Sequence, residues 1–210
     1  MGTVMRGPRQ QPADAGGVSL SRPGSQPGSV LMLLAALLLN LTVPCAEVSA
    51  QPAKPSQSEV QAVYLFDFAK FVRWPAELPA GSLDICIAGQ PAYVDSLKKI
   101  VAGESIDGHP LGVRLLQHPG DEAGCDVLFI GAAAKERLDS LIAATASKPV
   151  LTVSDIPGFL DRGGMIQFVL IENRVRFSVD LGPVTRGGIS LSSELLKVAV
   201  HVKPSGGGAP

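Results

Sequence analysis

Arginines and serines supply the side chains of this sequence that could bind an anionic ligand. Arg73 ends an apolar, helix-like stretch, and Arg174 and Arg176 lie in a strand-like run. Ser190 and Ser192 follow two glycines near the start of a helix, where free N–H groups attract anions. If these side chains converge, we expect a pocket for a phosphate or carboxylate. The alternatives are solvated arginines on an exposed face and a serine that only caps a helix.

The cysteines point to a disulfide. Cys86 and Cys125 each lie in or beside a strand-like run, and Cys45 lies in the N-terminal leader. A bridge between Cys86 and Cys125 would close a loop of about 40 residues, worth about 4 kcal/mol in the chain-entropy model. We favour this bridge over two independent buried thiols, because the sequence begins like that of an exported protein.

Catalytic and metal-binding patterns are missing from the sequence. His109, His118 and His201 have no metal-ligand spacing, and no G-x-S-x-G nucleophile turn occurs. The pair Gly163 and Gly164 lacks the G-x-G-x-x-G spacing of a dinucleotide site. The formal net charge is -1 with no polybasic run, which argues against a nucleic-acid partner. We therefore expect neither an enzyme nor a bound metal or cofactor.

The first 50 residues have the character of a signal peptide. The apolar run Val30 to Val43 is about 14 residues long, whereas a membrane span needs about 20. Small residues precede a cleavage site that we place after Ala50. A lipoprotein cleaved at Cys45 is the alternative, although Pro44 disfavours it. We divide the chain into a signal peptide and disordered leader (1–50), a linker (51–57), one domain (58–203) and a disordered tail (204–210).

The domain begins with an apolar stretch that reads as a helix. We expect its buried face to contain the residues spaced at i, i+3 and i+4, namely Val60, Val63, Tyr64, Phe68 and Phe71. Pro75 should end the helix near Arg73. Trp74 either packs at the edge of the core or contributes to a contact surface.

Strands and helices alternate through the rest of the domain. Strands are expected at 83–89, 111–116, 126–130, 150–153, 165–171 and 175–179, with the last two forming a hairpin. A short helix at 181–187 and a final helix at 191–202 should follow. This order predicts a single α/β domain with a mainly parallel mixed sheet of about six strands and helices on both faces.

Five stretches together resemble the YfiR family of periplasmic proteins, in the family's order. They are AVYLFDFAKFVRWP (62–75), ICIAGQ (85–90), CDVLFIG (125–131), VLTVSDIPGFLDRGGMIQF (150–168) and RVRFSVDLGPVTRGGISLSSELLKVA (174–199). The combination is specific, although no single stretch is. It covers nearly the whole expected mature chain.

The resemblance implies a regulatory function. It implies a periplasmic repressor that binds the sensor domain of an inner-membrane diguanylate cyclase and thereby limits cyclic di-GMP and biofilm formation. It also implies a possible outer-membrane lipoprotein partner, self-association into a homodimer, and a stabilising Cys86–Cys125 bridge. We expect partner contacts through the end of the first helix and through the last helix, at Phe71, Trp74, Leu195, Leu196 and Val198. The alternative is a periplasmic ligand-binding or sensing module of another signalling system.

The sequence departs from the family pattern at several positions. The second cysteine pair of some members is absent between 150 and 168, which excludes regulation through a second bridge. Asp180 stands where members often carry Asn. Ser190 and Ser192 replace basic or aromatic-polar residues of some relatives, which weakens the case for an inherited anion site.

Overall fold

The computed structural model describes residues 55–75 and 81–206. The expected signal peptide, the linker up to residue 54 and the last four residues of the tail lie outside the described residues. These residues belong to the compact unit Pro52–Pro210.

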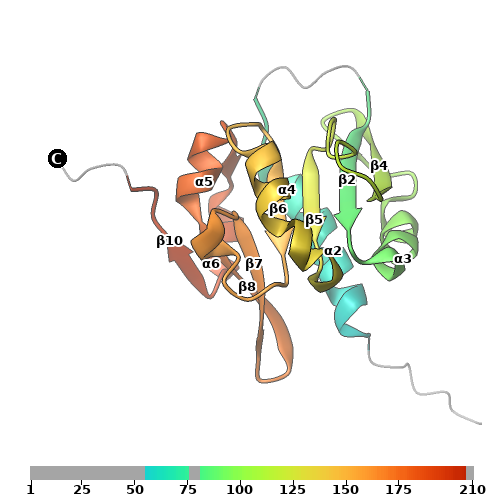
Figure 1. The fold of residues 1–210 in the computed structure, drawn as a ribbon. Helices are drawn as coiled ribbons and strands as arrows, with labels where there is room; N and C mark the ends of the chain where they lie inside the picture. Colours follow the sequence, from blue (N-terminus) through green and yellow to red (C-terminus); the bar gives the residue numbers. More distant parts are fainter. Residues whose placement is uncertain (1–54, 76–80, 207–210) are drawn as a thin grey trace, which may run out of the picture. The chain divides into compact units, whose positions relative to one another are not determined.

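A mixed sheet of eight strands forms the centre of this unit (Figure 1), in the order β10-β8-β7-β6-β5-β2-β4-β3. The strands are β2 (Leu83–Ala88), β3 (Ser105–Ile106), β4 (His109–Leu116), β5 (Val127–Ile130), β6 (Leu151–Ser154), β7 (Ile166–Ile171), β8 (Arg174–Asp180) and β10 (His201–Lys203). The pairs β4–β2, β2–β5, β5–β6 and β6–β7 are parallel. The β7–β8 and β3–β4 pairs are antiparallel, whereas β8 and β10 are parallel.

This architecture confirms the predicted α/β class and the mainly parallel sheet. The strand count was too low because β3 and β10 have only two and three residues and lie at the sheet edges. Segments this short carry no periodicity of their own, so only their pairing to β4 and β8 defines them as strands.

Helices cover both faces of the sheet and divide the apolar interior into two cores. The helices are α2 (Gln57–Phe71), α3 (Pro91–Val101), α4 (Leu138–Thr145), α5 (Leu181–Arg186) and α6 (Ser193–Val198), with 3-10 turns η1 (Ala132–Arg137) and η2 (Leu160–Arg162). In Figure 1, α2 lies behind the sheet and α4 in front. The larger core lies under α2 and α3, and the smaller one under η1 and α4. None of the described helices is both long and apolar enough to span a membrane.

Strands β2 and β5 are buried on both faces, as parallel strands of this kind require. Ile85 and Ile87 of β2 face the larger core, and Cys86 faces the smaller one. In β5, Phe129 points into the larger core, where its ring stacks on that of Tyr93 with centroids 4.7 Å apart.

The buried face of α2 matches the predicted one only in part: Val60, Tyr64 and Phe68 pack against the larger core, whereas Val63 and Phe71 are exposed. Val63 and Phe71 are 46% and 37% exposed, whereas Leu65 and Ala69 are fully buried. Phe68 is the predicted residue that is fully buried, and its ring meets that of Phe177 on β8 at 4.9 Å. The apolar stretch offers large side chains all round the helix, so the sequence could not show which side the sheet would cover.

The ends of the elements follow local hydrogen bonding. Ser56 caps α2 in a capping box, since its hydroxyl accepts from the N–H of Glu59 and the Glu59 carboxylate accepts from the N–H of Ser56. Glu172 and Asn173 both have positive φ, as the two central residues of a tight hairpin turn between β7 and β8 require. Helix α2 ends at Phe71, two residues before the predicted end.

The C-terminal segment differs from the single helix predicted at 191–202. Helix α6 ends at Val198, and the chain then continues into β10 beside β8. The main-chain N–H of Val200 donates to the carbonyl of Phe177 at 2.9 Å. Main-chain hydrogen bonds to β8 therefore replace those that a longer α6 would have formed within the helix.

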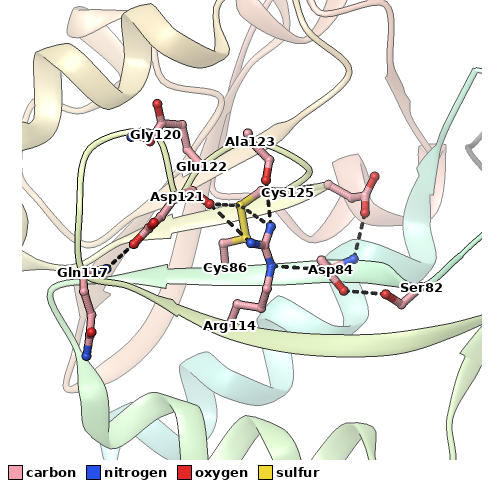
Figure 2. Close-up of a disulfide and its surroundings, with 11 residues drawn as sticks. Ser82, Asp84, Cys86, Arg114, Gln117, Gly120, Asp121, Glu122, Ala123 and Cys125 are labelled. Carbon is pink, nitrogen blue, oxygen red and sulfur yellow. Dashed lines mark hydrogen bonds and ion pairs between the residues drawn. A yellow bond between two sulfur atoms is a disulfide. The ribbon is translucent and has the colours of Figure 1, made fainter.

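The structure contains the predicted disulfide between Cys86 and Cys125, with the two Cα atoms 5.8 Å apart. Figure 2 shows that Arg114 of β4 lies against this bridge. Its guanidinium donates to the carbonyls of Asp121 and Ala123 at 3.4 and 3.0 Å. Its Nε lies 2.9 Å from Asp84 Oδ2, close enough for an ion pair although the atoms are not aligned for a hydrogen bond. Arg114 therefore holds the loop before Cys125 against β2 and β4.

The same loop is closed by a second carboxylate. Asp121 accepts hydrogen bonds from the N–H groups of His118 and Gln117, at 2.8 and 2.9 Å. These bonds lower the pKa of Asp121, because they stabilise the charged form.

Removing the bridge should destabilise the domain. In the Cys86→Ala/Cys125→Ala variant, the free energy of unfolding should fall by about 4 kcal/mol, because the unfolded chain regains the freedom of the loop. Urea unfolding of the two proteins measures the difference. Wild-type protein treated with dithiothreitol is the control and should unfold at about the variant's midpoint. Equal midpoints for oxidised and reduced wild type would contradict the prediction.

The carboxylate of Asp180 caps α5 and pairs with Lys203. It accepts from the N–H of Gly182 at 2.9 Å, its other oxygen lies 2.9 Å from Lys203 Nζ, and the residue is 4% exposed. Asp180→Asn retains an acceptor for the cap and should change the free energy of unfolding by less than about 0.5 kcal/mol. Asp180→Ala should cost about 1–2 kcal/mol, because the cap is lost.

Replacing Lys203 provides the comparison. Lys203→Met leaves a buried carboxylate without its cation and should therefore cost more than Asp180→Asn. Urea unfolding of all three variants gives the ranking. A smaller cost for Lys203→Met than for Asp180→Asn would show that the ion pair does not compensate the buried charge.

Candidate functional site

The end of α2 is joined to the chain that precedes α6. After Phe71 the chain forms the two-residue strand β1 (Val72–Arg73), which pairs antiparallel with β9 (Ser190–Leu191). The N–H of Ser192 donates to the carbonyl of Phe71 at 2.9 Å. Two segments more than a hundred residues apart in the sequence thus form one surface, which includes Arg73, Ser190 and Ser192.

A groove of about 600 Å³ runs along this junction. It is lined by Lys70, Phe71, Val72, Arg73, Trp74, Pro75, Asp107, His109, Ser192 and Glu194. Four of these residues were expected to contribute to a site, namely Phe71, Arg73, Trp74 and Ser192. We refer to this feature as the α2-end groove.

Charges of both signs face the α2-end groove. Lys70 and Arg73 bring positive charge, and Asp107 and Glu194 bring negative charge. The pKa of Glu194 is lowered by hydrogen bonds from its own N–H and from the Ser192 hydroxyl, with a smaller contribution from Arg73. The groove is therefore polar and mixed in charge, which differs from the cationic pocket that the arginines suggested.

Ser192 serves as the N-cap of α6, since its hydroxyl accepts from the N–H of Leu195 at 3.3 Å. This is the structural role that the sequence left open for the serines. Ser190 is exposed beside Arg73 in the β1–β9 pair.

Arg176 does not join Arg73. It lines a separate hollow near the start of α2, together with Arg174, Val60 and Tyr64. Helix α2 is roughly 22 Å long at 1.5 Å per residue. Arg73 follows the end of this helix and Arg176 lies near its start, so the two arginines are far apart. The strand pattern placed Arg176 on β8 correctly, but the direction of α2 across the sheet decides which residues meet.

The residues expected to contact a partner are in different environments. Phe71 is 37% exposed, and Trp74 packs partly buried against the larger core. The indole N–H of Trp74 is buried and lacks a hydrogen-bond partner among the described residues. Trp74 thus lies at the edge of the core and also lines the α2-end groove.

Helix α6 turns one of its leucines inward. Leu195 is 4% exposed and belongs to the larger core, so the folded domain does not offer it to a partner. Leu196 is partly buried, whereas Val198 and Val200 are 63% and 46% exposed. The exposed large apolar side chains at the end of α2 and from the end of α6 onward are Phe71, Val198 and Val200.

Sequence reasoning missed Asp107 and His109 as groove residues. They lie at the β3–β4 turn, where Asp107 has a φ of 50 degrees and His109 Nδ1 lies 3.0 Å from the carbonyl of Gly81. A turn signal is present around Gly108, but nothing local indicates that this turn reaches the end of α2. No cluster of three or more potential metal-ligating side chains occurs within residues 55–75 and 81–206.

Two solved structures resemble the fold. One is a conserved domain protein from Vibrio cholerae O1 biovar El Tor strain N16961, with 12% identity and a TM-score of 0.49 over 70% of this chain. The other is an ABC domain in complex with L-Trp from Streptococcus pneumoniae, with 10% identity and a TM-score of 0.48 over 69% of this chain. This chain spans 60% of the length of each of those structures.

A sequence model of the YfiR/HmsC-like family matches residues 58–200. The match begins at the first turn of α2 and ends just before β10, so it includes the disulfide and both segments of the α2-end groove. On this match, which extends over more than half of the chain, the protein belongs to the YfiR/HmsC-like family.

Proposed function

We propose that this protein is a periplasmic regulator of cyclic di-GMP signalling, and that it acts by binding another protein rather than by converting a substrate. The observation that carries this proposal is the family match over residues 58–200. The Cys86–Cys125 bridge supports an oxidising compartment. The apolar leader supports export, with cleavage after Ala50.

The proposed partner is the periplasmic sensor domain of an inner-membrane diguanylate cyclase. Repression by binding requires that the regulator has a higher affinity for the inactive state of the cyclase than for the active state. An outer-membrane lipoprotein that competes for the regulator would then release the cyclase. A homodimer is compatible with either complex.

The proposed contact surface is the exposed apolar region at the junction of α2 and α6. Phe71, Val198 and Val200 expose apolar side chains there, and the hydrogen bond from Ser192 to Phe71 fixes the two segments relative to each other. Exposed apolar residues on a rigid base are suited to a partner interface, because little side-chain or loop ordering opposes binding.

A charge at the exposed apolar end of α6 should weaken the complex. We expect Val198→Asp to lower the affinity for the sensor domain about tenfold or more, because a carboxylate would be desolvated against an apolar partner. Binding of the mature protein to the purified periplasmic domain of a diguanylate cyclase encoded next to its gene measures the effect. The matched control is Ile171→Asp, which alters an exposed apolar residue on the β7–β8 hairpin. Equal loss in both variants would place the interface elsewhere.

A second function is favoured by the α2-end groove. Its volume of about 600 Å³ is within the usual range for small-molecule sites, and Arg73 and Lys70 face it. The groove supports the alternative of a sensing module that binds a small anionic ligand. The mixed charge around Glu194 and Asp107 makes such binding weaker than in a purely cationic pocket.

Variants of Arg73 and Arg176 distinguish binding of an anion in the α2-end groove from nonspecific binding elsewhere on the protein. When nucleotides are titrated into the protein, Arg73→Ala should abolish any saturable binding, whereas Arg176→Ala should leave it unchanged because Arg176 lies at the other end of α2. Isothermal titration calorimetry measures both variants. The absence of saturable binding in the wild type, or an equal loss in both variants, would end the sensing hypothesis for this groove.

A further inference from the structure

A further cavity lies where strand β6 ends and the neighbouring β7–β8 hairpin continues. Strand β6 ends at Ser154, opposite Gln167 of β7, while the β7–β8 hairpin continues past this point. Figure 1 shows the hairpin extending beyond the neighbouring strands. The step leaves a cavity of about 360 Å³ between the hairpin, the first half of α2 and the segment after β6. It lies at the carboxyl end of a parallel strand, where α/β sheets commonly bind ligands.

The cavity has one polar and one apolar side. Gln57, Gln61, Gln167 and Asp155 provide the polar groups. The apolar side consists of Pro157, Phe168, Val169, Leu170 and Val175. We refer to it as the hairpin cavity.

Hydrogen bonds and strand pairing hold two of the polar side chains of the hairpin cavity, Gln61 and Gln167, in place. Gln61 is only 2% exposed, and its side-chain carbonyl accepts a hydrogen bond from the hydroxyl of buried Tyr93. Gln167 is fixed beside Ser154 by the β6–β7 pairing, and its carbonyl oxygen accepts from the N–H of Leu160 at 3.5 Å. The cavity walls are therefore largely formed before any ligand arrives.

Asp155 is the unusual residue of the hairpin cavity. Its Oδ1 atom is buried and has no hydrogen-bond partner among the described residues. Burial raises the pKa of this carboxyl group, although main-chain N–H groups of Asp155 and Ala132 partly offset the effect. A buried carboxylate oxygen without a partner lowers the stability of the fold, and such groups occur preferentially at functional sites.

We propose that the hairpin cavity binds a small organic cation, a primary amine or guanidinium that carries a short apolar group. The cationic head pairs with the carboxyl group of Asp155, which lines the cavity, and the apolar part lies against Phe168, Leu170 and Val175. This site is separate from the α2-end groove and from the proposed partner surface, so the inference does not rest on the proposed function.

The composition of the cavity favours a cation over other ligands. No Lys or Arg is among the described residues that line it, so an anion would meet the Asp155 carboxylate without a compensating charge. A neutral ligand of the same shape offers that carboxylate at most an uncharged donor and leaves its negative charge uncompensated. A volume of about 360 Å³ suits a compact molecule, since it is near the lower end of the range for ligand pockets.

Titration with 2-phenylethylamine tests the proposal, in phosphate buffer because Tris is itself an organic cation. We expect saturable binding by calorimetry, with amide chemical-shift changes at Gln61, Gln167 and Leu170. The isosteric alcohol 2-phenylethanol and the anion 3-phenylpropionate are the ligand controls. Each should bind at least about tenfold more weakly, because the alcohol offers the carboxylate only a neutral O–H donor and the propionate is repelled by it.

Variants then assign the binding to the carboxylate. Asp155→Asn should weaken amine binding about tenfold or more, whereas Asp95→Asn, which removes an exposed carboxylate on α3, should leave it unchanged. Asp155→Asn should also have a melting temperature at neutral pH at least equal to that of the wild type. The reason is that the pKa of Asp155 is higher in the folded state than in the unfolded state. The free energy of unfolding therefore falls as the pH rises past these pKa values, and replacing the carboxyl group by an amide removes this loss.

The outcomes decide the proposal in either direction. Saturable amine binding that is lost in Asp155→Asn, in a variant that remains folded, supports it. No saturable binding by the wild type, equal binding of the alcohol, or equal binding by Asp155→Asn would overturn it. None of these results depends on whether a cyclase partner is found.

Discussion

Burial of the central strands on both faces is the constraint that organises this fold. Strands β2 and β5 carry large apolar side chains in succession, so each face of the sheet needs a layer of helices to keep water out. The larger core receives Ile85, Ile87 and Phe129, and the smaller one receives Cys86. Because Cys86 points into the smaller core, the disulfide fixes the loop before Cys125 on the face that has fewer helices.

The C-terminal part of the chain is bound to α2 by main-chain hydrogen bonds. The β1–β9 pair and the bond from Ser192 to Phe71 bring the last helix to the end of the first. The α2-end groove, the exposed Val198 and the buried Leu195 are consequences of this junction. A regulator that acts by contact benefits from such a junction, because a surface formed by two fixed segments needs little ordering on binding.

The carboxylates of Asp84, Asp180 and Asp155, all buried or partly buried, are compensated to different extents. Asp84 is paired with Arg114, and Asp180 is paired with Lys203 while capping α5. Main-chain N–H groups only partly offset the effect of burial on the Asp155 carboxyl group, and its Oδ1 atom has no partner among the described residues. Since Asp84 and Asp180 each lie beside a cation and Asp155 does not, the position of Asp155 beside a cavity is a better indication of ligand chemistry than any spacing in the sequence.

Local and periodic signals in the sequence determined the α/β class, the parallel strands, the hairpin and the family resemblance. Each of these depends on residues close together in the chain or on extended motifs. The Cys86–Cys125 pair was favoured on cysteine count and is present in the structure. Tertiary structure alone decided which face of α2 is buried, that Leu195 is a core residue, that Arg73 and Arg176 lie apart, and that Asp155 adjoins a cavity. These features depend on how α2 crosses the sheet and where β6 ends beside β7, and such relations join residues whose separation in the chain leaves no periodic signal.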